Sequence, residues 1–512
     1  MKGKPHNPLL DLVPAEAASV PALFAAQVER RPEATFLLWE GERWSYEEAW
    51  REIRRFAAWV ARQGQAGGRP RVAGFLPNRP EALWAWLGTL TAGAVYVALN
   101  RAHRGDLLAD MVRRSGAELL VTDAEGESCL PDLADPRPRV ISAWEEIAAL
   151  EPAAPAAPAP GDLAELMYTS GTTGRSKAVE LSHAQLCRGA GWVAWSFEMT
   201  AADVFHAQLP LFHIAGQVDV VLPSLVAGGA VALHPTFSRS RFWEQVAANG
   251  STLVVGFPNL YRLLHSLPPR EGDGRNSLRA AMSATMPPEF VADFEARFDL
   301  SVREVYGMTE AEPMVLPWPG EATPPGSCGR PNPDFEVAVL GDDGRPAAPG
   351  GVGEIVCRSR VPGIRAGAYA DEAEASRAIA GNEWFHSGDL GRVDEDGFFY
   401  FGDRIRHAIR RRGESISSGE LEAAVAGHPA VADVCAIGVP SPLGEEDVKV
   451  VVVPARGEEV EPAALRAWCE GRMAAFMVPR FVEVVAELPR AETGKVMKEE
   501  LRGVGSAWDA EA

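Results

Sequence analysis

Residues 168–177 read YTSGTTGRSK, and they connect the apolar strand LAELM at 163–167 to a helical pattern that begins near Ser182. Residues 169–174 hold two glycines and four hydroxyl residues, which offer unhindered backbone N–H groups and side-chain donors to phosphate oxygens. Lys177 adds a positive charge, and the GxxxxGK[ST] spacing of a Walker A loop is absent. The pattern predicts a phosphate-binding loop, while composition alone also allows a flexible turn.

Helical patterns alternate with short apolar strands through most of the chain. A strand at 71–77 precedes a helix at 81–90 and a second strand at 94–100, and a strand at 251–258 precedes a helix at 259–267. This alternation is typical of βαβ units, in which helices cover parallel sheets. The fold class is therefore predicted to be α/β.

The sequence pattern changes after Phe401. Ser417 and Glu420 have the spacing of a capping box at a helix start. Strands are expected at 433–439, 448–455 and 480–488, with a helix at 462–473 between the last two. We therefore predict two domains, residues 1–403 and a small α+β domain at 404–512.

Charge and composition limit the partners. The 512 residues carry a net charge of -20, which argues against broad binding to nucleic acid or an anionic membrane.

The uncharged stretch 82–99 is predicted to be a buried helix running into a strand, not a membrane span. The N-terminus has no apolar signal region, and the six dispersed cysteines indicate no metal cage, so a cytoplasmic, reducing location is expected.

The whole loop resembles the phosphate-binding loop of the adenylate-forming superfamily, which contains acyl-CoA synthetases, peptide-synthetase adenylation domains and luciferases. Further segments similar to that family follow in the family order: LPLFHIAG (209–216), VYGMTE (305–310), GSCGRP (326–331), GGVGEIVCRS (350–359), WFHSGDLG (384–391), DRIRHAIRRRGESIS (403–417) and PRAETGK (489–495). The stretches 403–417 and 476–501 look most like the carnitine/crotonobetaine-CoA ligase branch.

The resemblance implies an architecture and a reaction. The large domain would contain two parallel-sheet subdomains and a β-barrel-like subdomain, and the small C-terminal domain would be a mobile lid. The implied enzyme uses ATP and Mg²⁺ to convert a small carboxylic acid to acyl-AMP with release of pyrophosphate. It then transfers the acyl group to coenzyme A. The oligomeric state stays open.

The resemblance also implies roles for single residues. Nucleotide-binding positions are the loop and four motif residues beyond it, namely Thr169, Ser170, Gly171, Thr172, Thr173, Gly174, Lys177, Tyr306, Gly307, Asp389 and Arg404. Thr309 would contact the α-phosphate, and Glu310 would bind Mg²⁺, since a carboxylate beside a triphosphate suits a metal ligand. Asp389 would accept hydrogen bonds from both ribose hydroxyls.

Two further residues are implied near the reacting atoms. Lys495 would bridge the carboxylate substrate and the α-phosphate, where a cation offsets the repulsion between two anions. His213 would act as a gate beside the acyl pocket, although a histidine in this apolar setting can also be a core residue.

Some positions depart from the family pattern. Ser176 and Ala178 differ in the loop, AMSATMPPE at 281–289 contains no glycine, and His407 replaces an acid after the hinge position Arg406. These departures concern the second half-reaction more than the first. Three alternatives to the implied reaction also stay open. The acyl acceptor could be an amine or a carrier-protein thiol, the activated group could be an unusual oxyanion such as nitrite, or the chain could be a nucleotide sensor.

Overall fold

A computed structural model describes residues 5–63, 69–130, 133, 138–142, 144–169, 177–284, 286–341, 343–362, 364, 368–370, 384–404, 409–411, 414–416, 418–441, 446–470, 472–473, 477–490, 496–503 and 505–510. The chain divides into two compact units. The first comprises Met1–Val337 and Cys357–Phe385, and the second comprises Ala338–Val356 and His386–Ala512. The expected boundary at 403/404 stays a prediction.

The two strands that flank the glycine-rich loop lie at one edge of a six-stranded sheet in the first unit. The strand order is β6-β5-β3-β4-β7-β8. These strands are β6 Arg139–Ile141, β5 Leu119–Thr122, β3 Arg71–Phe75, β4 Val95–Ala98, β7 Leu163–Thr169 and β8 Lys177–Ser182. The first five are parallel, and β8 pairs antiparallel with β7.

A seven-stranded sheet forms the other half of the first unit, in the order β13-β12-β11-β9-β10-β1-β2. Its strands are β13 Ser301–Glu304, β12 Ala280–Ser283, β11 Leu253–Val255, β9 Val204–Ala207, β10 Ala230–Leu233, β1 Thr35–Trp39 and β2 Glu42–Ser45. All neighbours are parallel except β1 and β2. The predicted α/β class is confirmed.

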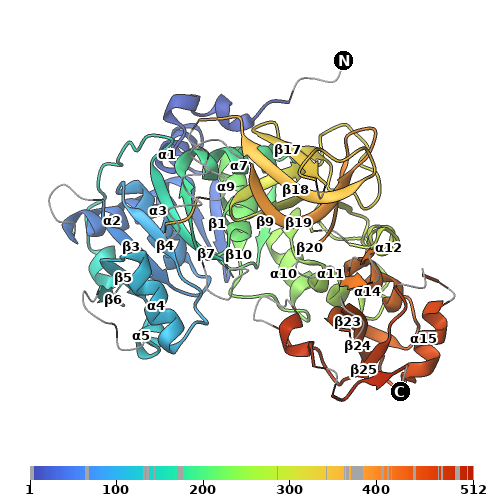
Figure 1. Cartoon of the computed structure of the whole chain (residues 1–512). Coiled ribbons are helices and arrows are strands. Elements are labelled where there is room, and N and C mark those ends of the chain that lie inside the picture. The colour runs from blue at the N-terminus through green and yellow to red at the C-terminus, as the bar shows by residue number, and fades with distance from the viewer. Residues whose placement is uncertain are drawn as a thin grey trace. The chain divides into compact units, whose positions relative to one another are not determined.

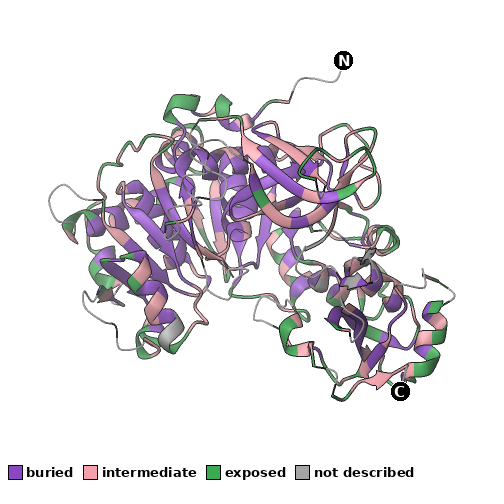
Figure 2. Ribbon diagram, viewed as in Figure 1, coloured by how far each residue is buried: buried purple, intermediate pink, exposed green. Residues whose placement is uncertain are grey.

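Helices flank these sheets (Figure 1). They are α1 Val20–Arg30, α2 Tyr46–Gln63, α3 Pro80–Thr91, α4 Gly105–Ser115, α7 His183–Ser196, α9 Leu222–Ala227, α10 Phe242–Asn249, α11 Pro258–His265 and α12 Pro288–Phe298. The Ser182 hydroxyl caps α7 by accepting a 3.1 Å bond from the Gln185 N–H. Nearly every residue of α3 is buried, and the strands of both sheets are mostly buried too (Figure 2).

Later segments of the chain, from Tyr306 to Arg404, form two smaller sheets. β14 Tyr306–Met308, β15 Ala311–Leu316 and β16 Arg330–Pro331 form an antiparallel three-stranded sheet. A four-stranded sheet has the order β17 Phe335–Leu340, β18 Val352–Ser359, β19 Phe385–Val393 and β20 Phe399–Arg404.

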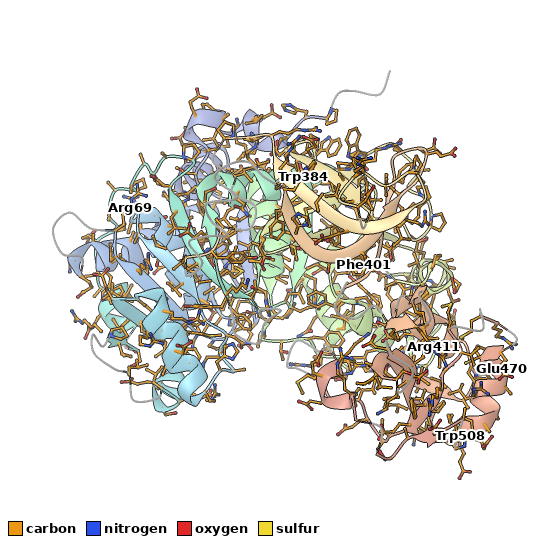
Figure 3. The ribbon with its side chains drawn as sticks, viewed as in Figure 1. Arg69, Trp384, Phe401, Arg411, Glu470 and Trp508 are labelled. Atoms are coloured by element: carbon orange, nitrogen blue, oxygen red, sulfur yellow. The ribbon has the colours of Figure 1, made fainter. Side chains whose placement is uncertain are left out.

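The C-terminal part of the second unit has its own core. A sheet in the order β23-β24-β25-β26 is joined by α14 Ser418–Ala426, α15 Pro462–Glu470 and the hairpin β21 Ile409–Arg411 with β22 Glu414–Ile416. The sheet strands are β23 Val431–Pro440, β24 Glu446–Pro454, β25 Phe481–Val484 and β26 Trp508–Asp509. Arg411 (Figure 3) is buried and donates a 2.8 Å bond to the Val478 carbonyl.

Several local predictions are confirmed and some bounds shift. The stretch 82–99 forms most of α3 and then β4, as expected. The strand expected at 480–488 is shorter, because β25 ends at Val484. Five of the six cysteines are buried free thiols, and Cys129 is partly exposed. Across the described residues, no helix is long and apolar enough to cross a membrane.

Candidate functional site

The YGMTE motif forms a tight hairpin. Tyr306, Gly307 and Met308 make up β14, and Met308 pairs with Ala311 of β15. Thr309 and Glu310 are therefore the two residues of the turn. The Gln185 side-chain amide on α7 donates a 3.0 Å bond to the Glu310 carbonyl, which fixes the turn against that helix.

Strands β7 and β8 hold the two ends of the glycine-rich loop. Thr169, the last residue of β7, pairs with Lys177, the first residue of β8. Residues 170–174 lie outside the described residues. The ends of the loop are thus fixed in register by an antiparallel ladder, which brings Thr169 and Lys177 together.

Tyr369 joins the loop-end lysine to the hairpin. The Lys177 Nζ lies 4.9 Å from the centroid of the Tyr369 ring, within the range of a cation–π contact. The Tyr369 hydroxyl donates a 2.9 Å hydrogen bond to Oε1 of Glu310. Three side chains from distant parts of the chain therefore meet at one place in the first unit.

Backbone bonds hold Tyr369 in this position. The Glu180 N–H donates to the Ala368 carbonyl at 2.8 Å, and the Ala370 N–H donates to the Ala178 carbonyl at 2.9 Å. Tyr369 itself forms an antiparallel bridge with Val179 of β8. The motif analysis did not identify Tyr369, because a tyrosine about sixty residues from Glu310 carries no local signal of this contact.

The chemistry of Glu310 suits a metal that arrives with a nucleotide. Within the described part of the chain, no group of three or more His, Cys, Asp or Glu side chains could hold a metal ion. Mg²⁺ is usually bound by one or two carboxylates together with substrate phosphates and water. The Glu310 carboxylate, 7% exposed and joined to the loop-end lysine through Tyr369, fits that mode of binding.

Asp389 and Arg404 lie opposite each other in the second unit, as a cross-strand pair of β19 and β20. Asp389 is 4% exposed, and its N–H donates to the Ser387 hydroxyl at 3.0 Å. Glu354 on β18 accepts from the Gly388 N–H at 2.9 Å and contacts His386 Nδ1 at 2.7 Å. Glu354 thus supports the turn before Asp389. The motif analysis did not identify Glu354, because an acid in an alternating strand usually faces solvent.

His213 stands at the start of the short helix α8 Ile214–Gly216, which continues into a π-helix, η3 Gln217–Val221. Among the described residues, His213 Nε2 has no hydrogen-bond partner. Burial, together with the nearby His103, lowers the pKa of His213 to about 4, so the ring is neutral near pH 7. His213 therefore differs from a core histidine in which both ring nitrogens are hydrogen-bonded.

Gln217, four residues after His213, binds a buried acid. Gln217 is fully buried and donates bonds of 2.9 Å to Glu165 Oε1 and to the Leu211 carbonyl. Glu165 also accepts from Trp86 Nε1 at 3.2 Å, and burial raises its pKa to about 8. Gln217 therefore braces the helix from within the core.

Some of the predicted positions lie outside the part of the chain that the structure describes. Lys495, Ser176, Arg406 and His407 lie outside the described residues, and of Arg404 only the backbone is described. The roles of all these residues stay predictions.

Comparison with known families gives two matches. Residues 24–364 match the model of the AMP-binding enzyme family, and residues 420–495 match the C-terminal domain of AMP-binding enzymes. The two matches cover most of the chain and lie in the order that the motifs predicted.

Curated relatives with similar sequences are CoA ligases. A crotonobetaine/carnitine–CoA ligase of Salmonella enteritidis PT4 (strain P125109) is 32% identical over 455 residues, which cover 84% of this chain and 88% of the relative. The protein of the same name from Escherichia coli O8 (strain IAI1) is 32% identical over 483 residues, covering 90% and 93%.

Solved structures with a similar fold are also adenylating enzymes. ATP-bound MatB from Rhodopseudomonas palustris has a TM-score of 0.85 at 27% identity, with 94% of this chain and 98% of that chain covered. The o-succinylbenzoate CoA synthetase MenE from Bacillus subtilis, in complex with its acyl-adenylate intermediate, has a TM-score of 0.83 at 25% identity, covering 95% and 99%.

Proposed function

The chain belongs to the AMP-binding enzyme family, and on this basis we propose how its residues carry out the reaction of an ATP-dependent acyl-CoA ligase. The reaction has two steps. A carboxylate oxygen attacks the α-phosphorus of ATP, which forms acyl-AMP and releases pyrophosphate. The thiol of coenzyme A then attacks the acyl carbonyl carbon, and AMP leaves.

We propose that the loop and the YGMTE hairpin bind the nucleotide. The backbone and hydroxyl groups of 169–174, together with Lys177, would bind the phosphates, Tyr306 would stack on the adenine beside Gly307, and Thr309 would donate to the α-phosphate. The two-residue turn supports this proposal, because a turn with both ends fixed presents its side chains at a defined place.

Glu310 would hold Mg²⁺ on the phosphates, with Tyr369 orienting its carboxylate. When bound, the metal neutralises the charge that develops on the triphosphate. The 2.9 Å bond from the Tyr369 hydroxyl to Oε1 would hold the Glu310 carboxylate in one orientation. Tyr369 also fixes Lys177, so two charged groups would be positioned by one side chain.

The other proposed roles depend on the second unit and on the acyl pocket. Asp389 would bind the ribose hydroxyls, with Arg404 beside it on the adjacent strand. Lys495 would offset the repulsion between the substrate carboxylate and the α-phosphate in the first step. His213, neutral and without a bonded partner for Nε2 among the described residues, would line the acyl pocket as its gate.

The observation that carries this proposal is the contact of Lys177, Tyr369 and Glu310 beside the glycine-rich loop. The purified chain should release pyrophosphate from ATP only when a suitable carboxylic acid is present, and it should form a thioester only when coenzyme A is added. Mass spectrometry of the quenched products distinguishes acyl-CoA from an amide or a stable adenylate. Pyrophosphate release with nitrite alone would instead favour oxyanion activation.

A further inference from the structure

The His213 turn (residues 209–213) is held in place by two buried amide side chains. Asn78 Nδ2 donates to the Leu209 carbonyl at 2.9 Å, and Asn78 Oδ1 accepts from the Leu211 N–H at 2.9 Å. Gln217 Nε2 donates to the Leu211 carbonyl at 2.9 Å. The N–H and the carbonyl of Leu211 are thus each bonded to one of these amides, which fixes the turn from two sides.

Asn78 places this turn at the carboxyl ends of three strands. It lies three residues after the end of β3, and it donates to the carbonyls of Leu209 and His234, which follow β9 and β10. β3 belongs to the six-stranded sheet, whereas β9 and β10 belong to the seven-stranded sheet. Ligands of α/β proteins bind at the carboxyl ends of such strands. The His213 turn therefore stands where a substrate is expected to bind.

A buried acid fixes the direction of the Gln217 side chain. Gln217 Nε2 also donates to Glu165 Oε1 at 2.9 Å, and Trp86 Nε1 donates to Glu165 Oε2 at 3.2 Å. Each of these three residues is at most 1% exposed. The Glu165 carboxyl group and the Leu211 carbonyl are both acceptors that need the NH₂ end of the amide, so together they decide which way it points. Gln217 also begins the π-helix η3, and short π-helices are frequent at functional sites.

Glu165 belongs to the strand that leads into the glycine-rich loop. β7 ends at Thr169, and because side chains alternate along a strand, Glu165 and Thr169 lie on the same face of it. Glu165 pairs in register with both neighbouring strands, β4 and β8, so it cannot shift without the sheet. The bonds from Glu165 through Gln217 to Leu211 therefore connect the His213 turn to the strand that carries the phosphate-binding loop.

We propose that Glu165 and Gln217 are positioning residues for the first step of the reaction. They hold the His213 turn at a fixed place relative to the glycine-rich loop, so that the bound acid meets the α-phosphate of ATP in a productive geometry. Neither residue touches a reacting atom. A misplacement of about 1 Å can lower a rate by about 10²-fold, which gives such a link a catalytic consequence. The inference rests on the proposed function, since it assigns residues to that reaction.

Three matched variants test the link. Gln217→Met and Glu165→Met keep the length of the side chain and remove its hydrogen bonds. Gln27→Met is the control, because Gln27 of α1 is also buried, at 3% exposed, and its Nε2 donates to the Val226 carbonyl at 3.0 Å, outside the His213 turn. All three variants are expected to lower the melting temperature, so stability alone does not distinguish them.

Hydrogen exchange followed by mass spectrometry measures the turn without any substrate. The peptide that covers 209–216 should exchange about tenfold faster in Gln217→Met and Glu165→Met, the scale of losing one or two hydrogen bonds. The control should leave this peptide unchanged. In the wild type, its amides should exchange at least about 10²-fold more slowly than in an unstructured peptide. Exchange at the unstructured rate would overturn the inference even if no variant folds.

Kinetics then distinguish positioning from a purely structural role. Pyrophosphate release is measured with acetate, propionate, butyrate and benzoate, and the acid that reacts best in the wild type is used for the variants. Gln217→Met and Glu165→Met should lower kcat/KM for this acid about tenfold, whereas calorimetry without acid should find ATP binding within about twofold of the wild type. The double variant should be no worse than Gln217→Met, because Glu165 acts through Gln217.

The outcomes separate this inference from the proposed function. If exchange of the 209–216 peptide is unchanged in both variants, or if it rises while the acid kinetics stay at the control value, the inference is wrong and the pair is purely structural. Active wild-type enzyme would in that case still support the ligase. If the wild type activates no acid, the proposed function fails; faster exchange in both variants would still support the link that holds the turn, and unchanged exchange would overturn it.

Discussion

Replacing Tyr369 with phenylalanine tests the contact that organises the proposed phosphate site. The change removes one hydroxyl, and with it the 2.9 Å bond to Glu310 Oε1, while the ring that faces Lys177 remains. A hydrogen bond to a charged group contributes about 1.5–3 kcal/mol. Because Tyr369 is partly exposed, we take the lower end, which corresponds to a loss of about tenfold.

The loss should appear in metal binding as well as in rate. We expect Tyr369→Phe to raise the magnesium concentration for half-maximal pyrophosphate release about tenfold, because the Glu310 carboxylate is no longer held in one orientation. Binding of Mn²⁺–ATP, followed by electron paramagnetic resonance without any acid substrate, should weaken by a similar factor. Glu310→Gln sets the upper limit of the effect, since it removes the anionic ligand.

A matched control exists in the second unit. The Tyr400 hydroxyl donates a 3.0 Å bond to Asp394 Oδ2, so Tyr400→Phe makes the same chemical change at a different carboxylate. It should leave both magnesium measurements unchanged. If Tyr369→Phe also leaves them unchanged while Glu310→Gln shifts them, the tyrosine does not position the glutamate and the reasoning is refuted.

Three further predictions follow from the other residues. Lys495→Ala should lower pyrophosphate exchange by about 10²–10³ while sparing ATP binding; exchange near the wild-type rate would remove Lys495 from the first step. Arg406→Pro should still allow a burst of acyl-AMP but slow thioester formation, because proline restricts the expected hinge; equal loss of both steps would mean general damage to the lid. Burial lowers the pKa of His206 to about 3, with a contribution from His234, so the unfolded state binds more protons and stability should fall as pH drops from about 6.5. His206→Gln should reduce the loss between pH 7 and pH 5 by about 2 kcal/mol in urea unfolding, and an unchanged loss would contradict this assignment.

The sequence predicted the elements whose periodicity is strong. Residues 82–99 are apolar on every side, and they form a buried helix and strand as that pattern indicates. The helix expected to begin near Ser182 is α7, and the structure adds that the Ser182 side chain caps it. The end of β25 was missed, because the residues after Val484 remain apolar although the ladder stops there.

The contacts within the site depend on tertiary structure, which a local pattern does not contain. Tyr369 reaches Glu310 because the segment 368–370 pairs with β8. Glu354 supports the turn before Asp389 from a different strand.

The most direct test of the ligase account is a quenched reaction of the purified chain with ATP, Mg²⁺ and a panel of carboxylic acids, with coenzyme A present or omitted. Mass spectrometry should detect acyl-AMP when coenzyme A is omitted, and acyl-CoA with AMP when it is added. An adenylate that never passes to coenzyme A, for any acid that the enzyme activates, would contradict the account.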